Sequence, residues 1–330
     1  MRYCREVKMM SMTIVMTCLL AALLALSCSA SPKLDVYTAD AEQQLPDFDA
    51  MWDYDRPAET EKQLRELLPA AESSGNTMYA LELKTQIART LGLQSKFDEG
   101  HAILDTVEKC LQPNLKRVRV RYLLERGRMF NSSDHPDKAK PLFIEAWDLG
   151  RSAHEEDLAV DAAHMVAIVE KGKASELWSN RALDYAETCK DKKARAWRAS
   201  LYNNLGWTYH DEGRYEEALA TFRKALKAHQ ENGRPEPTRI ARWTIARCLR
   251  SLGRVKEALA MQQDQVKIFD SQHRPYGAYV CEEMAECLYA LGQKKDSRPW
   301  FEKAYASLSK DDWLVSHEAA RIARLKLLSL

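Results

Sequence analysis

The sequence predicts an all-α protein, a right-handed α-solenoid of about six to seven helix-turn-helix repeats closed by a C-terminal capping helix. The stretch LYNNLGWTYHDEGRYEEALATFRKALK, Leu201 to Lys227, has helically spaced apolar residues on both sides of one tight turn. Related stretches recur along the chain. With only 12 Gly and 11 Pro among 330 residues, the sequence also lacks the many turns that a β-rich fold requires.

The recurrence is clearest when the chain is aligned on Gly206 and Ala218. Four further copies place Ala88, Gly127, Ala246 and Ala285 under Gly206. A weaker copy surrounds residues 162–182, and a half copy covers residues 53–71. Small residues at these positions let two helices cross closely, and large ones fill the gaps between them. One such hairpin cannot bury its apolar face alone, so stacked neighbours must share a continuous core.

The best copy resembles the tetratricopeptide repeat through Leu205, Gly206, Tyr209, Ala218, Phe222 and Ala225. The copies are longer than the usual repeat of about 34 residues. Asn203-Asn204-Leu205, together with Pro141 and Pro299 at one shared place in the second helix, is similar to the long repeats of kinesin-light-chain type. The resemblance implies a solenoid whose first helices line a concave groove for peptides or protein segments.

Residues 1–28 form the pattern of a signal peptide or signal anchor. Arg2, Arg5 and Lys8 precede an apolar run from residue 12 to residue 26, and small residues follow it. Cleavage before Cys28 would follow a lipobox-like ALSC and leave a lipid-anchored chain, although its leucines are displaced from the usual places. Cleavage after Ala30 is the alternative. The prediction is export, to the cell envelope with a lipid on Cys28 or as a secreted protein.

The remaining organisation follows from composition. Residues 29–49 are polar and acidic and are interpreted as a linker, residues 50–310 as the repeat array, and residues 311–330 as the capping helix. The acidic cluster Asp47, Asp49, Asp53 and Asp55 lacks the glycine and closing glutamate of a calcium loop. It is therefore interpreted as part of the solvated linker.

No residue pattern indicates catalysis, and the prediction is a non-enzyme without cofactor or metal. Phosphate-binding glycine loops, a nucleophile elbow and a histidine pair with metal spacing are all absent from the sequence. An enzyme built around His164 or Glu170 in the weak repeat remains a third hypothesis. The cysteines after residue 28 are unevenly spaced, as expected of buried small hydrophobes rather than a disulfide framework.

Nucleic-acid binding is not expected. The net charge is +1, and the basic runs at residues 116–121 and 192–198 alternate with apolar residues. The predicted partner is a protein or peptide, and the predicted contact with a membrane is only through the N-terminal anchor. The oligomeric state stays open.

The resemblance places one stripe of each first helix on the concave surface. Arginine and tryptophan dominate this stripe and are often energetic at interfaces, and arginine suits carboxylate-bearing segments. The candidate groove residues are Arg89, Arg128, Asn203, Trp207, His210, Trp243, Arg247, Arg250, Glu282 and Glu286. Asn204 matches one place of the carboxylate clamp of chaperone-binding relatives, but the lysines are missing, so that clamp is not expected.

The leading functional hypothesis is a non-enzymatic interaction scaffold that binds a peptide or protein segment in this groove. The alternative is a self-associating structural or assembly factor of the cell envelope, whose outer faces or C-terminal helix make the contacts.

Overall fold

The computed structural model describes residues 45–330, and these residues form helices joined by short turns. The first helices of the six pairs are α3 (Thr77–Leu93), α5 (Lys116–Ser132), α7 (Glu156–Val169), α10 (Arg198–Asp211), α12 (Pro235–Ser251) and α14 (Ala278–Ala290). The second helices are α4 (Phe97–Glu108), α6 (Pro136–Ser152), α8 (Gly172–Thr188), α11 (Tyr215–Glu231), α13 (Val255–Ser271) and α15 (Lys294–Leu308). The predicted α-solenoid of helix-turn-helix repeats is confirmed.

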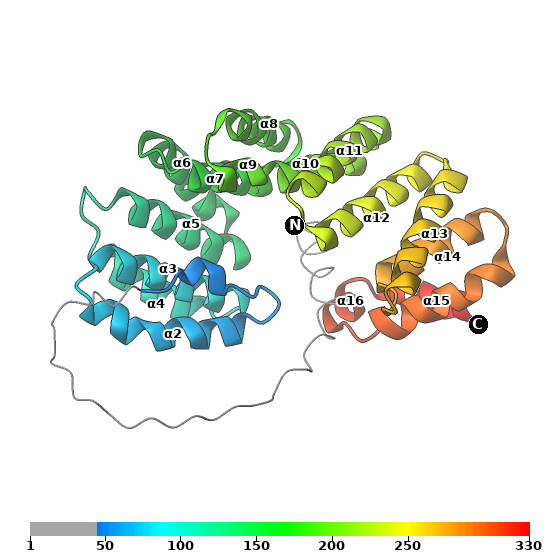
Figure 1. The fold of residues 1–330 in the computed structure, drawn as a ribbon, viewed down its shortest axis with the longest axis horizontal. Coiled ribbons are helices and arrows are strands. Elements are labelled where there is room, and N and C mark those ends of the chain that lie inside the picture. Colours follow the sequence, from blue (N-terminus) through cyan, green and yellow to red (C-terminus); the bar gives the residue numbers. More distant parts are fainter. Residues whose placement is uncertain (1–44) are drawn as a thin grey trace, which may run out of the picture.

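The pairs stack into an arch. Figure 1 shows the N-terminal pairs on one side, α7 to α10 across the top, and the C-terminal pairs descending on the other side. Within each pair the two helices pack together, and consecutive first helices also contact each other, as α3 does with α5 and α12 with α14. We call the surface formed by α3, α5, α7, α10, α12 and α14 the first-helix surface.

Close crossing of the two helices in a pair requires glycine at two places. A Cβ at Gly206 would lie 2.5 Å from the Phe222 ring, and a Cβ at Gly127 would lie 2.5 Å from the Phe143 ring. Both rings are fully buried. The small and large residues that define the repeat in the sequence are therefore explained by packing within each pair.

The weak repeat is the pair α7 and α8, and an extra element follows it. The short helix α9 (Lys192–Ala196) lies between α8 and α10 and contacts α7. This insertion lengthens the chain between the weak repeat and the pair α10 and α11.

Shorter elements lie at both ends of the array. At the N-terminal end, the 3-10 helix η1 (Phe48–Met51) precedes the unpaired helix α2 (Pro57–Ser73). At the C-terminal end, α16 (Asp312–His317) leads into α17 (Ala319–Ser329), which packs on α15. Along residues 45–330, no helix is both long enough and apolar enough to cross a bilayer.

The core divides into three clusters of buried apolar side chains. One joins η1, α2 and α3, a second runs from α3 to the first half of α10, and a third runs from Trp207 in α10 to Leu325 in α17. The second and third clusters therefore meet inside α10. Four of the five cysteines in the described part of the chain are buried, as the sequence interpretation predicted, and Cys110 is exposed.

Candidate binding surface on the first helices

Ion pairs between consecutive first helices run across the N-terminal half of the first-helix surface. The Arg128 guanidinium donates to the Asp161 carboxylate at 2.5 and 2.6 Å, and also to Glu125 at 2.6 Å. Arg89 reaches the same Glu125 oxygen at 3.3 Å. Burial alone would raise the pKa of the Asp161 carboxyl, but Arg128 and Arg89 hold it below its usual value. The predicted groove residues Arg89 and Arg128 thus already have carboxylate partners.

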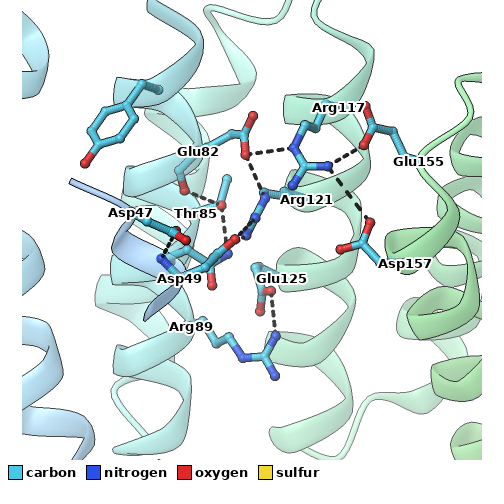
Figure 2. Close-up of polar contacts among 12 residues, drawn as sticks. Asp47, Asp49, Glu82, Thr85, Arg89, Arg117, Arg121, Glu125, Glu155 and Asp157 are labelled. Carbon is cyan, nitrogen blue, oxygen red and sulfur yellow. Dashed lines mark hydrogen bonds and ion pairs between the residues drawn. The ribbon is translucent and has the colours of Figure 1, made fainter. Parts of the chain in front are cut away.

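A second set of charges lies two helical turns earlier on the same helices. Arg121, whose side chain is 7% exposed, contacts Glu82 at 2.8 Å. Arg117 contacts Glu82 at 3.2 Å and also pairs with Glu155. Figure 2 shows this set as one connected group between α3, α5 and α7. Burial raises the pKa of the Glu82 carboxyl despite the two guanidinium groups.

The chain's own residues 45–55 lie on this part of the surface, and we call them the N-terminal strap. Both oxygens of Asp49 accept hydrogen bonds from Arg121, at 3.2 and 2.5 Å (Figure 2). The Trp52 indole N–H donates to Gln86 at 3.2 Å, and the Arg89 guanidinium lies 5.6 Å from the Trp52 ring. A segment rich in aspartate and aromatic residues therefore lies against α3 and α5.

The strap was not predicted from the sequence, and the interpretation of Asp49 as part of a solvated linker was wrong. Asp49 pairs with Arg121, 72 residues away, and Asp53 pairs with Arg56 at 2.8 Å. Phe48 is buried, 5.0 Å from the Tyr79 ring. The alternation of aspartates with Phe48, Trp52 and Tyr54 was the sequence feature that indicated a packed segment, since solvated linkers contain few aromatic residues.

Three of the six predicted groove residues on α10 and α12 are buried. Trp207 is 1% exposed and packs against Phe222 with ring centroids 4.9 Å apart. Trp243 is 3% exposed and donates its indole N–H to the Tyr279 carbonyl at 3.0 Å, and Asn203 is also buried. The expectation that Asn203, Trp207 and Trp243 face an open groove was wrong, since all three side chains are buried. Trp207 lies 6.3 Å from Trp243 on the next first helix, and Trp243 lies 5.7 Å from Tyr279 on the one after.

His210 is held at the end of the same stripe. Its ring lies 4.9 Å from Trp207 and 5.0 Å from Tyr215, and its Nε2 is 2.9 Å from the Ser251 hydroxyl. His210 is thus a packed side chain with a polar contact to α12.

The predicted residues of the C-terminal half form their own ion pairs. Arg250 binds Glu283 through two contacts of 2.6 and 3.0 Å. Glu282 binds Arg321 at 2.7 and 2.5 Å, and Glu286 binds Arg324. Arg321 and Arg324 belong to α17, so α17 is joined to α14 by the same kind of contact that joins consecutive first helices.

Arg247 differs from the other arginines of the predicted stripe. Its guanidinium lies 5.9 Å from the Trp207 ring and 5.7 Å from the Trp243 ring. The residue is half-buried, and within residues 45–330 no carboxylate forms an ion pair with it. Of the four arginines among the ten predicted groove residues, Arg247 is the one that forms no ion pair within the described part of the chain.

Nothing in the described part of the chain has the arrangement of a metal site, since residues 45–330 contain no cluster of His, Cys, Asp and Glu that could hold an ion. Burial lowers the pKa of His164 to about 4, and its Nε2 is 3.4 Å from the Asn204 amide nitrogen. Glu170 pairs with Lys140 at 2.5 Å. These two residues do not share a contact that would make them an acid and base pair.

An open depression of about 780 Å³ lies away from the predicted stripe. It is bounded by the loop before α5, the start of α5 and one face of α6. Pro113, Pro141, Ile144 and Leu149 supply its apolar part, and Arg119 pairs with Glu145 across its rim at 2.7 Å.

Comparison with known proteins agrees with this architecture. Residues 199–232 match the family model described as the tetratricopeptide repeat. This match is the pair α10 and α11, the copy that is clearest in the sequence. The chain thus contains a tetratricopeptide repeat, and its stacked pairs have the fold of tetratricopeptide-repeat solenoids. No curated protein sequence matches the chain.

Solved structures resemble the fold at low sequence identity. The apo form of RapI superposes with a TM-score of 0.62 at 14% identity, covering 80% of this chain and 74% of RapI. A signal transduction ATPase with a tetratricopeptide repeat sensor from Pyrococcus horikoshii gives 0.63 at 14% identity, over 82% of this chain and 42% of its own. A Rap protein complexed with Competence and Sporulation Factor gives 0.52 at 15% identity and 79% coverage of both chains. NprR in complex with its cognate peptide NprX gives 0.50 at 13% identity, over 85% and 81%.

The predicted N-terminal features, residues 1–28 with Cys28 and most of the 29–49 linker, lie outside the described residues.

Proposed function

We propose that the chain is a non-enzymatic scaffold that binds an extended protein segment on its first-helix surface. One observation supports the proposal: the chain's own N-terminal strap already lies against α3 and α5. Arg121 and Gln86 bind its side chains, and the Tyr79 hydroxyl donates a hydrogen bond to its Pro46 carbonyl. A surface that accepts a segment in cis has the chemistry to accept one from a partner. Similarity of fold to NprR, solved with its cognate peptide, supports the same proposal.

The strap also divides the surface. It lies against α3 and α5. The proposed site for a partner is the first-helix surface of α10, α12 and α14, where the half-buried Arg247 guanidinium lies beside Trp207 and Trp243. We call this surface the C-terminal binding surface.

Site-specific photo-crosslinking tests the proposal. A photoreactive amino acid replaces Ser251, which is exposed at the end of α12, and in a matched control it replaces Lys227, whose side chain on α11 is 80% exposed. After irradiation with membrane and secreted fractions of the source cells, adducts are expected from position 251 only. Identical adducts from both positions, or none from position 251, contradict segment binding on this surface.

We further propose that this scaffold acts outside the cytoplasm, on the strength of the signal-like residues 1–28 and the lipobox-like residues before Cys28. Mass measurement of the mature N-terminus distinguishes the outcomes. A chain that begins at Cys28 with added acyl mass supports lipid anchoring, one that begins at residue 31 supports secretion, and an intact Met1 contradicts processing.

A further inference from the structure

Arg247 combines three features that are not found together at the other predicted groove arginines. Its guanidinium covers two buried indole rings, those of Trp207 and Trp243. It is half-buried, which weakens its hydration and strengthens an added ion pair. It has no carboxylate partner in the described part of the chain, whereas Arg250, one turn further along α12, binds Glu283 in two places.

The N-terminal strap shows what such an arginine binds in this protein. Arg121 also lies near an aromatic ring, with its guanidinium 5.6 Å from the Phe48 ring. It takes up a carboxylate from a separate segment of chain, Asp49, through two hydrogen bonds. The strap carries four aspartates between residues 45 and 55, interleaved with three aromatic residues. A guanidinium prefers this planar, two-point contact with a carboxylate.

We infer that Arg247 is the carboxylate receptor of the C-terminal binding surface, and that the partner is an acidic protein segment which places an Asp or Glu side chain on it. The inference rests on the proposed function, since it names the class of segment that the surface takes. The neighbouring acidic residues do not oppose it, because Glu283 and Glu286 are already neutralised by Arg250 and Arg324.

The alternative to an Asp or Glu side chain is the C-terminal carboxylate of a polypeptide. The side-chain source is favoured because Asp49 supplies a side chain, within a segment that continues on both sides. The experiment therefore uses peptides with an amidated C-terminus and compares them with the free acid.

The probe is a fluorescent peptide with the sequence of the strap, LPDFDAMWDYD, titrated into the purified full chain and followed by anisotropy. Arg247→Gln is expected to weaken binding by about 10-fold or more, as expected for losing a charge-assisted hydrogen-bonded pair. Arg247→Lys keeps the charge and is expected to retain part of the affinity. Arg242→Gln, on the same helix, is the matched control and is expected to bind as the native chain does.

A second peptide, in which all four aspartates are replaced by asparagine, completes a double-mutant cycle with Arg247→Gln. It is expected to bind the native chain about 10-fold more weakly, and to lose little further affinity with Arg247→Gln. Equal binding of the amidated peptide and the free acid supports the side-chain source, and a strict requirement for the free acid overturns it. Equal affinity of the native chain and Arg247→Gln, or no measurable binding of the acidic peptide, also overturns the inference.

These outcomes separate the inference from the proposed function. If the peptide crosslinks at position 251 but its affinity is unchanged by Arg247→Gln and by replacement of the aspartates, segment binding is supported. The role of Arg247 as carboxylate receptor is then contradicted. If position 251 forms no adduct with any partner protein or with the peptide, the proposed function is contradicted as well. Should Arg247→Gln unfold, the comparison of the two peptides on native chain and Arg247→Lys still decides the question.

Discussion

At the scale of single residues, the packing of Gly206 decides how closely α10 and α11 can approach. The edge of the Phe222 ring lies 2.5 Å from where a Cβ would be, and the ring is fully buried with its centroid 4.9 Å from that of Trp207. In an exposed helix, replacing glycine by alanine stabilises by about 1 kcal/mol. Here the sign is reversed, because the added methyl group must displace a ring that has no space to move into.

Gly206→Ala is expected to lower the free energy of unfolding by about 1–3 kcal/mol, the usual effect of overpacking. Urea unfolding followed by circular dichroism measures this change. Phe222→Leu removes the clashing ring atoms, so the double variant Gly206→Ala with Phe222→Leu should lose less stability than the two single changes added together. Additive losses would show that the glycine is required for another reason.

Burial of His164 makes the stability of the protein depend on pH. The pKa of His164 is lowered to about 4, and the ring packs 5.5 Å from Trp197 with Asp161, Arg128 and Asn204 beside it. An unfolded histidine titrates near 6.5. Between about pH 6.5 and pH 4 the unfolded chain therefore binds a proton that the folded chain does not, and stability falls as the pH falls.

The expected slope from this histidine is about 1.4 kcal/mol per pH unit within that window, with no further contribution below the folded pKa. Urea unfolding at pH 7.5, 6 and 5 measures it. His164→Gln should show a smaller loss between pH 7.5 and pH 5 than the native chain. If the two proteins lose stability in parallel, the histidine does not titrate as its burial requires.

At the scale of elements, the N-terminal strap is a segment without long regular structure that is held by side chains of α3 and α5. The hydroxyl of Tyr79 donates to the Pro46 carbonyl at 2.7 Å, and the backbone N–H of Asp53 donates to the Thr60 hydroxyl at 3.1 Å. The pair between Asp49 and Arg121 is the charged contact among these. Removing it should loosen the strap while leaving Arg121 paired with Glu82.

Asp49→Asn is expected to increase the rate of amide hydrogen exchange in residues 45–55 by about 10-fold or more, because a charge-assisted contact is lost. Mass spectrometry of peptic fragments measures the exchange. Asp98→Asn, at an exposed site in the first turn of α4, is the matched control and should leave the strap unchanged. Unaltered exchange in the strap of Asp49→Asn would mean that Phe48 and Trp52 hold it without the ion pair.

The sequence predicts the elements better than it predicts their surfaces. Gly206 and Phe222 lie 16 residues apart within one pair, and the α-helical period with one short turn places them together. Arg128 and Asp161 lie 33 residues apart in different pairs. Their contact depends on the angle between consecutive repeats, and hydrophobic periodicity carries no information about that angle.

At the scale of the whole molecule, the pairs follow one another along the arch (Figure 1), and the buried apolar side chains form separate clusters. The two larger clusters meet inside α10, where Leu205 belongs to one and Trp207 to the other. In stacked-repeat proteins, stability is approximately the sum of repeat and neighbour terms. The C-terminal cluster should therefore open without complete unfolding of the N-terminal one.

Phe301→Ala in α15 tests this division. Phe301 is fully buried, and its truncation is expected to cost about 3–5 kcal/mol. Native-state hydrogen exchange should show the loss in α14, α15 and α17, with a change below about 1 kcal/mol in α5 and α6. Phe143→Ala in α6 is the reciprocal variant, and equal losses along the whole chain from either change would show a single cooperative unit.

The sequence by itself determined the helical pairs, the turns between them and the small and large residues at each crossing. Those features depend on contacts within about 20 residues, which the helical period places reliably. The tertiary structure decided which residues of the first helices remain available. Trp207 and Trp243 are buried, each near an aromatic ring of the next first helix, and Asp49 found Arg121 across 72 residues. Among the four predicted groove arginines, Arg247 is the one without an ion pair to any residue of the range 45–330, an outcome set by the geometry between repeats.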